Sequence, residues 1–209
     1  MIAIDALTIH SDALIIFLRS PEEGKVKTRL AKTVGAAKAL NIYRELLSIT
    51  FNQIQNLDCT VYLYFFPYID RNFLEKTPFI GRLQKGADLG LRMQQAFQDV
   101  LQSHHQVLLI GTDCPDITKT LLEEAFIQLQ NHDIVLGPAT DGGYYLIGLR
   151  QVHNCLFAGI DWSTERVLSQ TLQAAEGMNL SFSLLPEHND IDLEDDWIRF
   201  LNRPGSHQG

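Results

Sequence analysis

The chain has 209 residues, of which 45% are hydrophobic and 20% charged, and its formal net charge is -8. A chain of this length fits one large domain that buries roughly two-thirds of its unfolded surface, so it needs no disulfide or metal to fold. The acidic balance excludes a general binder of nucleic acid or of anionic membranes, because such proteins present a broad basic face. It still permits a small basic pocket that binds a phosphate.

Compartment and redox state follow from two further features. Cys59, Cys114 and Cys155 are far apart and lack the spacing of a zinc site, so we expect three reduced thiols. The first residues lack the charged start and long apolar run of a signal peptide, and no stretch is long enough for a membrane helix. We therefore expect a cytoplasmic protein without a membrane partner.

Apolar runs of strand length alternate with segments of helical periodicity along the chain. The expected strands are 13–18, 59–66, 106–111, 133–138, 144–149 and 180–185. The expected helices are 34–54, 88–101, 118–130, 167–175 and 197–201. Several strands are continuously apolar, which is typical of parallel strands covered on both faces.

This alternation predicts βαβ crossovers and hence an α/β fold with a single doubly wound, mostly parallel sheet. The expected domain spans residues 13–203, after an N-terminal extension over 1–12 and before a tail over 204–209. Ligands of such sheets bind outside the carboxyl ends of the strands, and four polar clusters fall at those ends.

The first cluster, RSPEEGKVKTRLA (19–31), follows the first strand and brings Lys25, Lys27 and Arg29 close to a helix start. Cations together with free backbone N–H groups suit a phosphate, although the segment lacks the pattern of a Walker loop. Glu22 and Glu23 offset part of the charge. A solvated surface loop is therefore the alternative interpretation.

The second cluster, QKGADLGLRM (84–93), has glycines on both sides of Asp88. Gly86 could allow a ligand to approach the backbone closely, whereas Asp88 could simply cap the helix that follows. The third cluster, GTDCPDIT (111–118), places Asp113 directly after a buried strand, where a rigid carboxylate suits Mg²⁺. We interpret Asp116 as a cap of the next helix, with Thr118 as the other candidate.

The fourth cluster lies in LGPATDGGYYLIGL (136–149), where Asp141, Gly142 and Gly143 form a hairpin-like turn between two apolar runs. Further on, DWSTERVL (161–168) predicts the start of a helix with Ser163 or Thr164 as its cap. Such a helix start is a possible anion site. NDIDLEDDW (189–197) is either a second source of metal ligands or a set of acids at a helix start.

Taken in order, these segments resemble a family of small bacterial proteins, DUF2064, usually described as glycosyltransferase-like. GKVKTRLA, GADLGLRM, GTDCPDI, LGPATDGGYYLIGL, DWST and DID carry the resemblance, which runs from about Ile15 to Trp197. More distantly, the chain is similar to 2-phospholactate and molybdenum-cofactor guanylyltransferases. Arg19 and Ser20 precede the loop proline where the family has Lys and Ala, and Ala87 replaces a glycine.

The resemblance implies the nucleotide-diphospho-sugar transferase (GT-A) fold and a transferase that depends on Mg²⁺ or Mn²⁺. Its donor would be a nucleoside triphosphate or a nucleotide-sugar, and its acceptor a small molecule. The residues implied are Lys25, Lys27 and Arg29 for donor phosphates, Gly86 and Asp88 for the nucleoside, Asp113 and Asp192 for the metal, and Asp141, Gly142, Gly143, Trp162, Ser163 and Thr164 for the acceptor.

Two chemistries remain open at this point. The cationic loop favours nucleotidyl transfer, with Asp113, Lys27 and Arg29 as the catalytic residues, because a triphosphate carries more charge than a nucleotide-sugar. The family's usual description favours glycosyl transfer. A nucleotide-binding protein of the same fold without catalysis is the alternative from another class.

Overall fold

A seven-stranded sheet forms the centre of the computed structural model, which describes residues 12–203. The strands are β1 (Asp12–Arg19), β2 (Thr60–Phe66), β3 (Ile80–Leu83), β4 (Gln106–Ile110), β5 (Ile134–Pro138), β6 (Tyr144–Leu149) and β7 (Phe182–Leu184). Their order is β3-β2-β1-β4-β6-β5-β7, and only β6 runs antiparallel to its neighbours β4 and β5. The predicted α/β fold with a mostly parallel sheet is confirmed.

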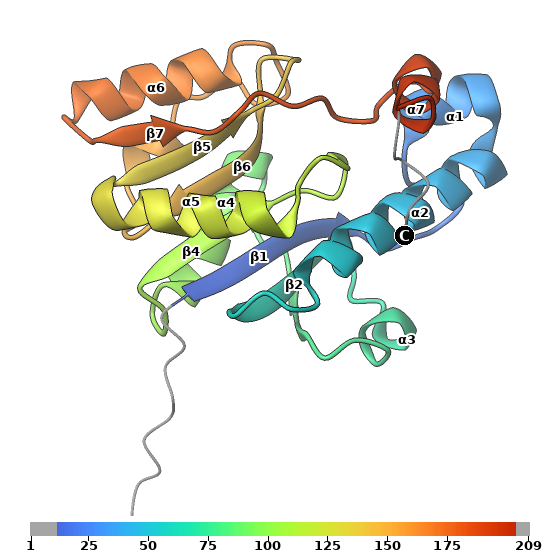
Figure 1. Ribbon diagram of the computed structural model, residues 1–209, viewed down its shortest axis with the longest axis horizontal. Coiled ribbons are helices and arrows are strands. Elements are labelled where there is room, and N and C mark those ends of the chain that lie inside the picture. The colour runs from blue at the N-terminus through green and yellow to red at the C-terminus, as the bar shows by residue number, and fades with distance from the viewer. Residues whose placement is uncertain (1–11, 204–209) are drawn as a thin grey trace, which may run out of the picture.

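Helices cover both faces of this sheet, as Figure 1 shows. They are α1 (Thr28–Val34), α2 (Ala36–Ile54), α3 (Arg71–Leu74), α4 (Leu89–Val100), α5 (Lys119–Asn131), α6 (Val167–Gly177) and α7 (Glu194–Leu201), with a short 3₁₀ turn, η1 (Asn154–Leu156). Buried residues of α2 and α5 pack on one face of the sheet, and those of α4 and α6 pack on the other.

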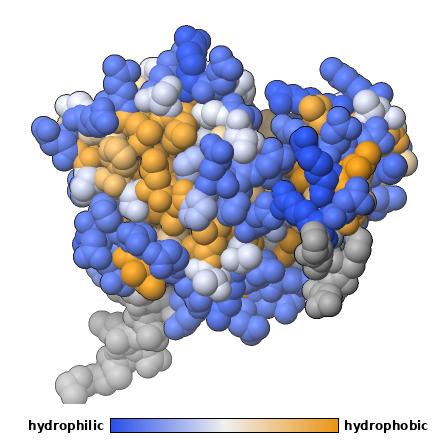
Figure 2. Space-filling view, turned by 45° about the horizontal axis from the view of Figure 1, so that its top comes forward, coloured by the Kyte–Doolittle hydropathy of each residue, from blue (hydrophilic) through white to orange (hydrophobic). Residues whose placement is uncertain are grey.

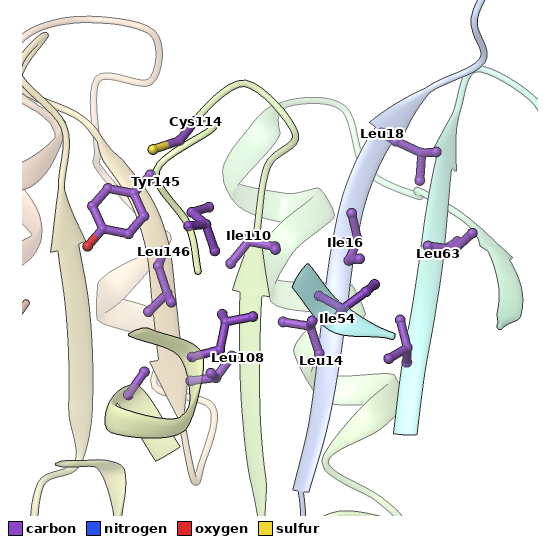
Figure 3. Close-up of a cluster of buried hydrophobic side chains, with 14 of the residues drawn as sticks. Leu14, Ile16, Leu18, Ile54, Leu63, Leu108, Ile110, Cys114, Tyr145 and Leu146 are labelled. Atoms are coloured by element: carbon purple, nitrogen blue, oxygen red, sulfur yellow. The ribbon is translucent and has the colours of Figure 1, made fainter. Parts of the chain in front are cut away.

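The continuous apolar run of β1 reflects this two-sided burial. Leu14, Ile16 and Leu18 point to the α2 and α5 side, and Figure 3 shows them with neighbours from β2 and β4. The alternate residues Ala13 and Ile15 belong to the cluster on the α4 and α6 side. Side chains alternate between the two faces of a strand, so a strand buried on both faces needs apolar residues at every position.

A third, smaller cluster lies beyond the edge of the sheet, where α1, α2 and α7 meet. Its buried members are Leu30, Ala39, Ile42, Leu46, Ile191, Trp197 and Phe200. Two of them, Leu30 and Ile191, stand in segments that also carry candidate functional residues. This cluster therefore fixes the chain on both sides of those residues.

The structure differs from the predicted elements in several places. The predicted helix over 34–54 is wrong at its start, because Gly35 adopts φ 84° and separates α1 from α2. The edge strand β3 and the short helix α3 were not predicted from the sequence, and α7 begins three residues before its predicted start. The expected N-terminal extension and tail lie, apart from Asp12, outside the described residues.

Among the helices of residues 12–203, none combines the length and the apolar character that crossing a bilayer requires.

Candidate active site

A cleft of about 700 Å³ opens at the carboxyl ends of β1 and β4 and the start of β6. Its first wall consists of the loop after β1 and the chain around Asp190 and Asp192. Its second wall consists of Asp141, residues 143–145, residues 162–165 and Val167, whereas the predicted site residue Gly142 does not line the cleft. In the space-filling view, a notch at the upper rim separates the part that carries α6 from the part with α1 and α7 (Figure 2). The cleft lies where ligands of open α/β sheets bind.

Lys27 lies at the centre of the first wall. Its Nζ is 2.8 Å from Asp113 Oδ1 and 3.4 Å from Asp192 Oδ1, and it donates a 2.6 Å hydrogen bond to the carbonyl of Ile191. Only 4% of its side chain is exposed. Burial alone would lower the pKa of Lys27, but the charges of Asp113, Asp192 and Asp190 outweigh it and raise the pKa, so the ammonium stays charged.

The path of the backbone explains why Lys27 points inward. Lys27 adopts φ 45° and ψ 46°, immediately before α1 begins at Thr28, and buried Val26 and Leu30 anchor the chain on either side. Lys25 is exposed and does not line the cleft. Of the three predicted phosphate ligands, the structure therefore brings Lys27 and Arg29 to the cleft and leaves Lys25 on the outer surface.

Asp113 is the third residue after the end of β4 at Ile110, and its backbone ties it to the first wall. Its carbonyl accepts a 2.8 Å hydrogen bond from the N–H of Ile191, and 43% of its side chain is exposed. The interpretation of Asp116 as a helix cap is wrong. Asp116 pairs with Arg203 at 2.6 Å, and Thr118 caps α5 by accepting from the N–H of Leu121.

Asp190 is a cleft residue that was not singled out from the sequence. Its Oδ1 is buried and has no hydrogen-bond partner within the part of the chain that the structure describes. Burial, together with the like charges of Asp113, Asp141 and Asp192, raises the pKa of Asp190 to about 7, although Lys27 opposes this shift. This carboxylate is poorly compensated and faces the cleft, which is typical of a functional residue.

The chain that carries Asp190 and Asp192 is held from both ends. Ile191, between them, is 1% exposed and packs in the cluster formed with α1, α2 and α7. Asp196, in the first turn of α7, accepts hydrogen bonds from the N–H groups of Asp192 (3.1 Å) and Leu193 (2.8 Å). Asp192 in turn pairs with Lys27 and, at 3.1 Å, with Arg29.

The second wall begins with the turn between β5 and β6, and the predicted hairpin is present. Asp141 Oδ1 accepts a 2.9 Å hydrogen bond from the N–H of Gly143 and so stabilises the turn. Gly142 adopts φ 85°, and a Cβ there would lie 2.2 Å from the carbonyl oxygen of Glu165. The turn therefore depends on glycine for its conformation and for its close contact with the 163–166 loop.

Trp162 links this wall to α4. Its indole packs so closely on Gly90 that a Cβ at Gly90 would lie 2.2 Å from Nε1. The predicted cap of the following helix is wrong, since α6 begins at Val167 after Arg166 and has no side-chain cap. Ser163 instead adopts φ 65°, within a loop in which Thr164 donates to the carbonyl of Asp161 at 2.7 Å. Both residues line the cleft.

The two residues predicted to flank the nucleoside do not line the cleft. Asp88 caps α4 by accepting from the N–H of Leu91 at 2.8 Å, which was the simpler of its two interpretations. Gly86 adopts φ 137°, and its carbonyl accepts from Arg92 Nε at 3.1 Å. They position the start of α4, whose residues Leu89 and Met93 do line the cleft.

The floor and sides of the cleft also include residues that the sequence did not indicate. The most informative are Arg19, at the end of β1, and the aromatic side chains Phe17, Tyr144 and Tyr145. Tyr43 fixes Arg19 by exchanging 2.9 Å hydrogen bonds with its backbone N–H and carbonyl. The cleft thus combines a charged first wall with an apolar, aromatic interior.

The charges in the cleft indicate what it can hold. Three basic and five acidic side chains line it, so an added polyphosphate meets a net negative surface: Arg19, Lys27, Arg29, Asp113, Asp141, Glu165, Asp190 and Asp192. Carboxylate oxygens are the ligands that Mg²⁺ and Mn²⁺ prefer, and the partnerless Oδ1 of Asp190 can accept a cation. Within residues 12–203, no three acidic, histidine or cysteine side chains form a ready-made metal site.

The family model "Uncharacterized protein conserved in bacteria (DUF2064)" matches residues 50–164. A candidate nucleotide-diphospho-sugar transferase from Desulfovibrio desulfuricans G20 is 33% identical, with a TM-score of 0.86 over 92% of this chain and 87% of its own. No curated protein matches the sequence.

More distant solved structures share the fold. The inositol-1-phosphate CTP transferase from T. maritima is 12% identical, with a TM-score of 0.61 over 90% of this chain and 91% of its own. Rv0371c from Mycobacterium tuberculosis H37Rv, in complex with manganese, is 12% identical, with a TM-score of 0.58 over 92% and 98%. Because the family model covers more than half of the sequence, the chain belongs to the DUF2064 family and has the nucleotide-diphospho-sugar transferase fold.

Proposed function

We propose that this protein is a divalent-metal-dependent transferase that binds a nucleotide donor in the cleft and transfers a nucleotidyl or glycosyl group to a small acceptor. The observation that carries the proposal is the cluster of Lys27, Asp113, Asp190 and Asp192 at the carboxyl edge of the sheet. A buried ammonium surrounded by carboxylates, one of them without a partner, suits a site completed by a cation and a phosphate.

In this proposal Asp113 and Asp190 hold the metal. Asp192 is less suited than expected from the sequence, because both of its oxygens are engaged by Lys27 and Arg29. Asp190 replaces it as the second carboxylate, since its Oδ1 lacks a partner. When bound, the metal would neutralise donor phosphates, which is why the net acidic cleft can accept a polyphosphate.

The chain's own residues supply the remaining functions. Arg29 and Arg19 face the same space and would bind the phosphates that the metal leaves exposed. Lys27, whose Nζ is engaged by Asp113, Asp192 and the Ile191 carbonyl, would contribute its positive charge to the same site. The aromatic interior and the second wall, with Asp141, Trp162 and Thr164, would orient the acceptor and exclude water. Such transfer needs an oriented acceptor oxygen and a stabilised leaving group, and no protein nucleophile.

Support comes from two sides. The D. desulfuricans relative carries the name of a nucleotide-diphospho-sugar transferase, and the T. maritima protein of the same fold is a CTP transferase. The manganese complex of Rv0371c indicates that the fold accommodates a divalent metal. The acids and cations of this chain lie together at the edge of the sheet that the fold uses for ligands.

Product analysis tests the proposal and separates the two chemistries. The purified protein is incubated with Mg²⁺, a pool of small hydroxylated acceptors and, in turn, each nucleoside triphosphate or nucleotide-sugar. Release of pyrophosphate indicates nucleotidyl transfer, and release of a nucleoside diphosphate indicates glycosyl transfer. Asp113→Asn is the control and is expected to lose at least about 100-fold in rate. Donor binding that needs no metal and yields no product would favour the non-catalytic alternative, and equal rates in the variant would contradict the proposal.

A further inference from the structure

A second cavity, of about 500 Å³, lies at the opposite edge of the sheet from the cleft. It is built where β4 begins at Gln106, where Asp133 precedes β5 and where Arg150 follows the end of β6. Because β6 runs antiparallel to β4 and β5, its end meets their beginnings here. The cavity is therefore separated from the cleft by the length of these strands.

The lining of this cavity is polar and rich in basic groups. His104, His105, His153 and Arg150 contribute to it, and Asp133 is the acidic residue among those that line it. Imidazole and guanidinium groups are common ligands of phosphates and carboxylates. A cavity of this size is within the range of small-molecule sites.

Asp133 keeps its negative charge in the cavity, but its Oδ2 is already engaged by Ser181. Its Oδ2 accepts hydrogen bonds from the N–H of Ser181 at 2.8 Å and from the Ser181 hydroxyl at 2.7 Å. These bonds, helped by the nearby charges of His153 and Arg150, lower the pKa of Asp133. By contrast, Arg150 uses one N–H, donated to the carbonyl of Gln130 at 3.2 Å, among its described hydrogen bonds.

Gln106 offers a hydrogen-bond acceptor to a molecule bound in this cavity. Its Oε1 is buried and has no hydrogen-bond partner among the described residues. Buried acceptors are nearly always paired, so a donor from outside the described chain is expected there. A hydroxyl or amine on a bound molecule could supply it, while the anionic end of the same molecule meets Arg150 and His153.

We propose that this second cavity is a binding site for a small hydroxylated anion, such as a phosphate ester or a hydroxycarboxylate. Arg150 and His153 bind its anionic group, and Gln106 accepts a hydrogen bond from its hydroxyl. The site uses no residue of the cleft and is independent of the transferase reaction proposed above.

The test is an NMR titration of backbone amides in the full chain. Glycerol 3-phosphate and malate are the two probes, and glycerol is the neutral control. The expected result is saturable shifts of the amides around Gln106 and Asp133 with at least one anion and none with glycerol. Which anion binds identifies the headgroup.

Two matched variants separate the cavity from the cleft. Arg150→Gln is expected to weaken binding at this site at least tenfold, and Arg29→Gln, in the cleft, is expected to leave it unchanged. His153→Gln is a second variant of the cavity and should weaken binding several-fold. Shifts confined to the amides around Gly111 and Asp113, loss of binding in Arg29→Gln alone, or no saturable shift with either anion would each overturn the proposal.

Discussion

The two walls of the cleft are held together by different forces. The first wall is an ionic cluster, in which Lys27 is enclosed by Asp113, Asp192 and the Ile191 carbonyl. The second wall is held by backbone geometry, in which Gly142 fits closely against the carbonyl of Glu165. The first wall is therefore expected to depend on the balance of its charges, and the second on a close backbone contact that gives it a defined shape.

The largest effect is expected from Lys27→Met. The change leaves three neighbouring carboxylates without their buried cation, and we expect a loss of about 3 kcal/mol in the free energy of unfolding. Urea denaturation measures it, and Mg²⁺ should restore more stability to the variant than to the parent. Lys25→Met, at the exposed neighbour, is the matched control and should change stability by less than about 0.5 kcal/mol. Equal effects of the two changes would contradict an ionic first wall.

Gly142→Ala probes the second wall and is expected to cost about 2 kcal/mol or more. The added Cβ would meet the Glu165 carbonyl at 2.2 Å in a backbone conformation that already disfavours alanine. Gly159→Ala is the control, because Gly159 also has a positive φ, of 75°, but has nothing within 4 Å of the added Cβ. Thermal unfolding of both variants separates the destabilisation caused by the steric contact from the destabilisation caused by the backbone conformation. If both lose the same amount, the close contact with Glu165 has no energetic role.

Asp190→Asn is expected to stabilise the first wall, whereas Lys27→Met is expected to destabilise it. It removes a buried charge that is poorly compensated, so the metal-free protein should gain about 1 kcal/mol at neutral pH and lose Mg²⁺ binding. Asp192→Asn is the control and should lose stability, because it breaks the pairs with Lys27 and Arg29. Urea denaturation and metal titration of both variants measure these effects. A destabilised Asp190→Asn protein would show that the charge of Asp190 is well accommodated.

The smallest effect concerns a site outside both walls. Hydrogen bonds from Ser181 lower the pKa of Asp133 below its unfolded value, so the contribution to stability is present near neutral pH and is lost as the pH falls below about 4. Asp133→Asn should cost about 0.5 kcal/mol at pH 7, because the site is largely exposed to solvent. The difference from the parent should shrink as the pH falls through the lowered pKa of Asp133 and vanish at pH values below it. A difference that persists there would exclude the ionised carboxylate as its cause.

Much of the fold was predictable because the central strands are apolar at every position. β1, β4 and β5 are buried on both faces and read as continuous apolar runs. β3 was missed because it is a four-residue edge strand in which Ile80 and Leu83 are more than one-third exposed. The break at Gly35 was missed because the apolar periodicity of α2 continues toward it.

The site was only partly predictable, for a different reason. Asp113 was found because it comes shortly after a buried strand, a local feature of the sequence. Asp190 was missed because its burial and raised pKa arise only when segments far apart in the chain, among them those of Asp113 and Asp141, converge on it. The contrast between Lys25 and Lys27 depends on one residue in the left-handed region, which the sequence alone did not indicate.

The most direct test of the proposed cleft function is isothermal titration with nucleoside triphosphates and nucleotide-sugars, first with Mg²⁺ and then with EDTA. The net acidic lining predicts that one donor binds with Mg²⁺ and at least tenfold more weakly in EDTA, and that Asp113→Asn abolishes the difference. Equal affinity with and without metal, or no binding of any donor, would contradict the account.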